Sequence, residues 1–125
     1  MAESSYQIVE HFCEAWKHHN LDQIMAFFTD DAEYQNVPMG PGAKGKAAIK
    51  GVIDTFWPMA KSIEFKVLRA AANGNIVMNE RIDMFDLGGG KKIELPVAGV
   101  FEVREGKIAL WRDYFDLAMY TKQMG

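Results

Sequence analysis

Three charged side chains have the types and spacing that acid–base chemistry needs: Arg81, Asp83 and Asp113. Arg81 and Asp83 are two residues apart in a segment that alternates like a strand, so their side chains share a face and lie within reach of each other. An arginine between two carboxylates can pair with both. Burial raises the pKa of a carboxyl group and a guanidinium lowers it, so two carboxyls in different environments can serve as one acid and one base.

Tyr34 and Asn36 supply a hydroxyl and an amide that alternate in the same way and that can hold a water molecule. A held water, a base and an acid are the parts of a general acid–base hydrolysis without a covalent intermediate. The same spacing also fits a buried ion-pair network that only satisfies its own charges. The residues alone leave both interpretations open.

The second half of the chain alternates with period two, which predicts four strands at 62–72, 75–87, 91–104 and 107–116. Turn signals separate them at Asn73-Gly74, Gly88–Gly90 and Glu105-Gly106. A shorter strand is expected at 32–37. Alternation then places three groups on shared faces: Ala32, Tyr34 and Asn36; Val77, Asn79, Arg81, Asp83 and Phe85; Ala109, Trp111, Asp113 and Phe115. The opposite register carries Ile76, Met78, Ile82 and Met84, which suggests a second buried surface or a dimer interface.

Helical spacing predicts a first helix over 4–19, with Ser4 and Gln7 as a capping box. A short second helix is expected after Asn20, with Ile24, Met25, Phe27 and Phe28 on its apolar side, followed by a turn at Thr29–Asp31. A loop at 38–45 precedes a helix at 47–57 that ends at Pro58, and the last helix is expected at 117–124. The predicted fold is α+β: a curved, mostly antiparallel sheet with helices packed over its concave face, forming a cone with a cavity.

The 125 residues correspond to a single domain, 1–125, with 49% hydrophobic and 25% charged residues. The net charge of −3 and the scattered basic residues argue against nucleic acid. Cys13 is the only cysteine, which fits a reducing compartment. The opening residues MAESS lack the features of a signal peptide, and no apolar run is long enough for a membrane span. We therefore expect a soluble cytoplasmic protein.

Several other residues and patterns are weak evidence for a nucleotide site, a metal site or a further catalytic group. Gly40–Lys46 nearly matches a P-loop, but Ala47 stands where the magnesium-binding hydroxyl belongs. Cys13 is expected to be a packing residue, and Asp116 is expected to cap the last helix rather than to serve as the base. The three histidines lack partners at metal-ligand spacing: His11, His18 and His19.

Four short patterns together resemble the limonene-1,2-epoxide hydrolase family, one of the nuclear-transport-factor-2-like (SnoaL-like) cone folds. They are Tyr34-Gln35-Asn36, Arg81-Ile82-Asp83, Trp111-Arg112-Asp113 and the strand Leu95–Glu102. They occur in order and at compatible spacing over nearly the whole chain. Single pieces are weak, but the five polar positions together are specific.

The resemblance implies roles for these five residues. Asp113 would be the base that takes a proton from water, and Tyr34 and Asn36 would hold that water with it. Asp83 would be the acid that protonates the epoxide oxygen, and Arg81 would bridge the two carboxyls. The product of a small apolar epoxide would be a vicinal diol, with inversion at the attacked carbon.

The resemblance also implies that no metal or organic cofactor is needed. It implies a homodimer formed through the outer sheet face, which suits Met78, Ile82 and Met84. Two other function classes stay open on the same fold: an isomerase or cyclase of the ketosteroid isomerase or polyketide cyclase type, and a non-catalytic binder of small ligands. The arginine held between two carboxylates argues against the first, and the cost of burying two carboxylates argues against the second.

Overall fold

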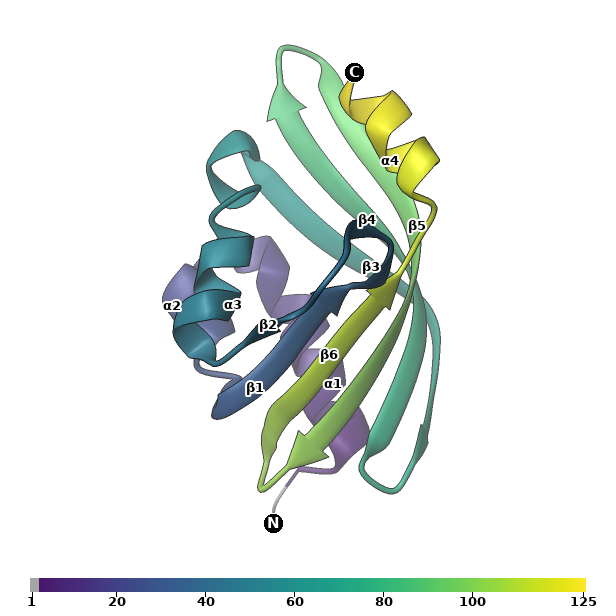
Figure 1. The fold of residues 1–125 in the computed structure, drawn as a ribbon. Helices are drawn as coiled ribbons and strands as arrows, with labels where there is room; N and C mark the ends of the chain where they lie inside the picture. The colour runs from purple at the N-terminus through teal and green to yellow at the C-terminus, as the bar shows by residue number, and fades with distance from the viewer. Residues whose placement is uncertain (1–2) are drawn as a thin grey trace.

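The computed structural model describes residues 3–125, in which helices cover one side of a single curved sheet (Figure 1). The expectation about a signal peptide falls partly on residues 1–2, which lie outside the described residues. The sheet has the order β2-β1-β6-β5-β4-β3. Its strands are β1 Phe28–Asn36, β2 Ala43–Lys44, β3 Ser62–Asn73, β4 Ile76–Gly88, β5 Lys91–Arg104 and β6 Lys107–Tyr114. The predicted fold class is confirmed.

The four long strands form three consecutive antiparallel hairpins, as the turn signals predicted. Gly74 has a φ of +62° in the first turn, a conformation that glycine adopts at little cost. The exception to the antiparallel pattern is β1, which runs parallel to β6 and places Tyr34 beside Trp111 and Asn36 beside Asp113. Turn signals give no information on this pairing, because it joins distant parts of the chain.

The helices are α1 Ser5–Ala15, α2 Leu21–Met25, α3 Lys46–Ile53 and α4 Leu117–Met124. The capping box of α1 is formed in both directions, between Ser4 and Gln7. One apolar side of α1 is buried against the sheet, and the helix lies behind β1 and β6 in the view of Figure 1.

Three local predictions were wrong. The second helix ends at Met25, and Phe28 begins β1 instead of extending that helix. Thr29–Asp31 lie within β1 and not in a turn, because an irregularity in the β1–β6 register accommodates them. Asp31 there accepts a hydrogen bond from Thr29 and pairs with Arg104. The third helix is also shorter than predicted, and Pro58 lies inside a one-turn 3-10 helix at Trp57–Met59.

The core lies between α1 and the concave face of the sheet, where five aromatic side chains are fully buried: Phe12, Trp16, Phe28, Phe101 and Trp111. The convex face is different. Met78 is 54% exposed and Ile76 40% exposed, and Ile82 and Met84 are partly buried, so the second apolar surface faces outward in the single chain. Within residues 3–125, no helix combines the length and the apolar character needed to cross a membrane.

Candidate active site

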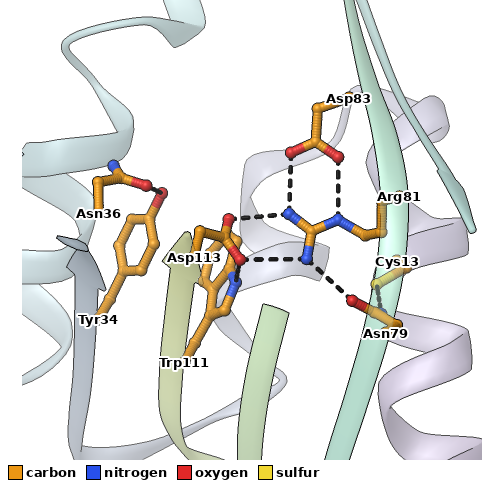
Figure 2. Close-up of polar contacts among 8 residues, drawn as sticks. All are labelled: Cys13, Tyr34, Asn36, Asn79, Arg81, Asp83, Trp111 and Asp113. Atoms are coloured by element: carbon orange, nitrogen blue, oxygen red, sulfur yellow. Dashed lines mark hydrogen bonds and ion pairs between the residues drawn. The ribbon is translucent and has the colours of Figure 1, made fainter. Parts of the chain in front are cut away.

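The five polar residues selected from the sequence meet at the concave face of the sheet (Figure 2). Arg81 and Asp83 extend from β4, Asp113 from β6, and Tyr34 and Asn36 from β1. Arg81 is completely buried, and Asp113, Tyr34 and Asp83 are each less than 5% exposed. The alternation of the strands therefore predicted the correct face for all five.

The Arg81 guanidinium uses all five of its N–H donors. Nε donates to Asp83 Oδ1 at 2.9 Å, and Nη2 donates to Asp83 Oδ2 at 2.9 Å and to Asp113 Oδ2 at 2.8 Å. Nη1 donates to Asp113 Oδ1 at 3.1 Å and to Asn79 Oδ1 at 3.2 Å. Each carboxylate is held in a two-pronged contact, which fixes its position and its orientation.

Asp113 has a third donor. The indole Nε1 of Trp111 donates to Asp113 Oδ1 at 2.7 Å. Trp111 itself is fixed by the core and stacks on the Tyr34 ring, with centroids 3.9 Å apart and planes 13° apart. Three N–H donors thus converge on the Asp113 carboxylate and fix its position at the wall of the cavity.

Tyr34 and Asn36 are joined beside Asp113. The Tyr34 hydroxyl donates to Asn36 Oδ1 at 3.1 Å. The amide oxygen is therefore occupied, and among residues 3–125 the Nδ2 group has no hydrogen-bond partner. The Nδ2 group of Asn36 and the lone pairs of the Tyr34 hydroxyl are thus left to bind a water molecule or another small polar group near Asp113.

Burial and neighbouring charges shift the pKa values of three groups in the site. Burial raises the pKa of Asp83 to about 6, against the attraction of Arg81, and the negative charge of Asp113 adds to the rise. Burial also raises the pKa of the Tyr34 hydroxyl well above its usual range, with a further rise from Asp113, so it stays neutral. For Arg81, burial opposes the charge, but Asp113 and Asp83 outweigh it and the pKa is raised. Asp83 is therefore the carboxyl prepared to hold a proton.

The two carboxyls, Tyr34 and Asn36 open into one cavity with about 120 Å³ accessible to the centre of a water molecule. A single water needs only roughly 10–15 Å³ by this measure, so there is room for a small organic molecule. Most of the wall is apolar: Met39, Val52, Phe56, Met59, Phe65, Phe85, Leu87, Ile93, Leu95, Val97, Phe115 and Met124. Arg81 does not line this cavity, because it lies behind the carboxyls that it holds.

Sequence reasoning missed three contributors to this site. Trp111 was assigned only to a strand face and a short pattern, without a role, and its indole N–H is bonded to Asp113. Asn79 was placed on the correct face without a role, and it accepts a hydrogen bond from Arg81.

The third contributor is Gly99 on β5, which is paired in the sheet with Asn79 of β4 on one side and with Asp113 of β6 on the other. A Cβ atom at Gly99 would overlap Nη1 of Arg81 and lie 2.9 Å from Asn79 Oδ1. A glycine inside a strand is a signal of such a close approach.

The residues set aside from the sequence, Asp116 and Cys13 among them, do not line this cavity. Asp116 caps α4 by accepting a hydrogen bond from the backbone of Met119. Cys13 is buried in the core, and burial raises the pKa of its thiol to about 12. Within residues 3–125, no three His, Cys, Asp or Glu side chains gather closely enough to hold a metal ion.

Comparisons with known proteins identify the family of this chain. Residues 3–125 match the model of the limonene-1,2-epoxide hydrolase catalytic domain. The epoxide hydrolase EphG of Mycobacterium tuberculosis is 35% identical over 114 residues, which are 87% of this chain and 71% of that protein. A solved LEH-like epoxide hydrolase of M. tuberculosis is 32% identical with a TM-score of 0.81, over 95% of this chain and 87% of that chain.

The fold is also shared with more distant proteins. An NTF2-like protein of unknown function from Burkholderia pseudomallei has a TM-score of 0.84, over 97% of both chains, at 15% identity. At that identity the likeness concerns the fold alone.

Proposed function

Because the chain belongs to the limonene-1,2-epoxide hydrolase family and is an epoxide hydrolase of that type, we propose that it adds water to a small apolar epoxide in one acid–base step. The observation that carries this mechanism is the arginine bridge between Asp83 and Asp113, with both carboxyls opening into an apolar cavity beside Tyr34 and Asn36. No covalent enzyme intermediate, metal or organic cofactor takes part.

Asp113 is the base in this proposal. A water molecule beside it donates one hydrogen to Asp113 and the other to the Tyr34 oxygen, and it accepts a hydrogen bond from Asn36 Nδ2. The direct pairing of Asn36 with Asp113 across β1 and β6 supports this arrangement. The remaining lone pair of the water is directed at a ring carbon of the epoxide.

Asp83 is the acid. Its pKa, raised to about 6 by burial and by Asp113, supports a protonated carboxyl that can donate to the epoxide oxygen. In the step, a bond forms between the water oxygen and one ring carbon while the bond from that carbon to the ring oxygen breaks. The water proton passes to Asp113 and the Asp83 proton passes to the ring oxygen. The product is a vicinal diol with inversion at the attacked carbon.

Arg81 keeps the charge of the site constant. Before the step Asp113 is negative and Asp83 neutral, and after it the reverse holds. The guanidinium contacts both carboxyls, so it compensates one negative charge in either state. The buried site therefore never carries a net charge, which would be costly in an apolar surrounding. Proton exchange after the diol leaves restores the starting state.

The assembly belongs to the same proposal. We infer that residues 1–125 act as one hydrolase domain and that two chains pair through the convex face of the sheet. The exposure of Met78 and Ile76 on that face supports the pairing. Met78→Lys is expected to shift the sedimentation coefficient to that of a monomer, whereas a dimer unaffected by it would place the contact elsewhere.

The proposal is tested by diol formation from limonene oxide and cyclohexene oxide, with the wild type beside Asp113→Asn. We expect diol from the wild type and a rate about 10²- to 10⁴-fold lower from the variant, which keeps the shape of the side chain but not the base. Unfolding curves of both proteins provide the control for folding. A variant with a near-normal rate would show that another group is the base. Isomerised or cyclised product instead of diol would favour the isomerase or cyclase alternative.

A further inference from the structure

Arg81 has three hydrogen-bond partners, and Asn79 is the one that does not line the cavity shared by the two carboxyls. It lies two residues before Arg81 on the same face of β4 and is only 6% exposed. Four of the five guanidinium N–H groups are bonded to the two carboxyls, and the fifth is bonded to Asn79 Oδ1 at 3.2 Å. Asn79 thus completes the hydrogen bonding of a fully buried cation (Figure 2).

The Asn79 amide is itself held in this orientation. Its Nδ2 group donates to Cys13 Sγ on α1 at 3.5 Å, which directs the oxygen toward Arg81. A second cavity, with about 220 Å³ accessible to the centre of a water molecule, adjoins Asn79 between α1 and strands β3 and β4. The side chain therefore has free space beside it. The contact with Cys13 opposes rotation of the amide away from Arg81.

Nη1 of Arg81 is the atom on which this arrangement acts, because it bonds both Asn79 and Asp113. The other edge of the guanidinium is already fixed by the two bonds to Asp83. Removing the Asn79 oxygen would leave one N–H of a buried cation without an acceptor. The group would then turn toward another acceptor and move Asp113 relative to Asn36.

We propose that Asn79 is a positioning residue for the hydrolysis: its Nδ2 group is held by Cys13, and its amide oxygen fixes the Arg81 guanidinium and through it the Asp113 carboxylate. This inference rests on the proposed function, since it concerns how the base is aligned with its water. Asn79 does not line the cavity into which the two carboxyls open, so its effect falls on the rate of the chemical step and not on substrate binding.

The first test compares kcat and KM of the wild type, Asn79→Leu and Val103→Ala. Leucine has nearly the shape of asparagine but offers no acceptor. We expect kcat to fall about 10- to 100-fold, as displacements of roughly 1 Å do in active sites, with KM within about threefold. Val103 is buried at the far end of β5 and touches none of these groups, so Val103→Ala controls for lost stability. It is expected to keep the wild-type kcat.

A smaller change tests the link to α1. Cys13→Ala removes the sulfur acceptor and leaves Asn79 in place, so we expect a kcat loss smaller than that of Asn79→Leu and of the same kind. Equal kcat values for Asn79→Leu, Val103→Ala and the wild type would overturn the proposal. So would a loss that appears only in KM.

The second test uses Asn79→Asp, which keeps the acceptor oxygen and is informative even if Asn79→Leu does not fold. The titratable and charged groups around this position are Arg81 on β4, Asp113 across β5 on β6, Arg69 on β3, and Tyr6, Glu10 and Cys13 on α1. The added carboxylate would contact the same guanidinium, and its negative charge would make the proton of Asp83 harder to remove. We expect the alkaline limb of the kcat profile to move up by about one pH unit. An unchanged limb would count against coupling through Arg81.

These outcomes separate the two proposals. If the wild type forms diol and Asp113→Asn does not, the proposed function stands whatever Asn79→Leu does. If the wild type forms no diol, the proposed function fails first, and no rate difference at Asn79 can be interpreted as positioning.

Discussion

Two buried regions share the concave face of the sheet and are held together by different physics. In the aromatic core, Phe12 contacts Trp111 with ring centroids 5.0 Å apart, and Trp16 stacks on Phe65 at 4.6 Å. Such contacts depend on shape and volume, and they tolerate best the substitutions that conserve volume. In the polar cluster, Arg81 and the two carboxyls are bound by directional bonds of 2.8–3.1 Å. There, the loss of one atom leaves a buried charge unpaired.

Trp111 connects the two regions. Its rings are fully buried in the core, while its Nε1 group bonds Asp113. The core therefore sets the position of the base, although no core side chain takes part in the chemistry. The comparison teaches that equal burial does not mean equal tolerance: changes of similar size are expected to be mild in the core and severe in the cluster.

The largest effect is expected from Arg81→Met, which removes the cation and leaves two buried carboxyls facing each other. Breaking a buried pair in this way costs about 3–5 kcal/mol of unfolding free energy, and diol formation should be lost with it. Urea unfolding at neutral pH measures the first and product analysis the second. A stable and active Arg81→Met protein would show that the cluster tolerates change as the core does.

A smaller loss of unfolding free energy, with a steric cause, is expected from Gly99→Ala. The added methyl group would overlap Nη1 of Arg81, so we expect a loss of about 1–3 kcal/mol in unfolding free energy from overpacking and a reduced kcat. Gly51→Ala is the matched control, because a Cβ there meets nothing within 4 Å and the residue lies in α3. It is expected to gain about 0.5–1 kcal/mol. Equal behaviour of the two variants would contradict the close approach at Gly99.

These variants also show what the sequence could and could not predict. Period-two alternation selected the correct face for Arg81, Asp83 and Asp113, because side-chain direction in a strand is a local property. The parallel pairing of β1 with β6 is not local, and neither is the contact of Gly99 with a guanidinium from the neighbouring strand. The turn predicted at Thr29–Asp31 is absent because turn-forming residues can also occupy an irregular stretch of a strand.

The pH dependence separates the two carboxyls within the cluster. Because burial raises the pKa of Asp83 to about 6, the acid loses its proton as the pH rises through that value, and kcat/KM is expected to decline above it. A kcat/KM that stays level well above pH 6 would exclude Asp83 as the acid.

The same shift has a consequence for stability. The folded protein keeps a proton that the unfolded chain releases at its ordinary pKa of 3.8, so the unfolding free energy should decrease as the pH rises from 3.8 to about 6. Asp83→Asn should lack this decrease. Urea unfolding across this pH range measures both proteins, and identical slopes would contradict the shift.

The smallest effect is expected in the core. Ile108→Val removes one methylene from a fully buried side chain of β6 that lies away from the cluster. A loss of about 0.5–1.5 kcal/mol in unfolding free energy is expected, with kcat unchanged. A large kcat loss from this change would mean that the core and the cluster are more tightly coupled than the contact through Trp111 implies.

The central claim, direct attack by water without a covalent intermediate, is tested most directly by a single turnover in ¹⁸O-labelled water with enzyme in excess over epoxide. The account predicts one labelled oxygen in the diol and no label in the protein. Unlabelled diol, with the label in the carboxyl of Asp113 or Asp83, would contradict it.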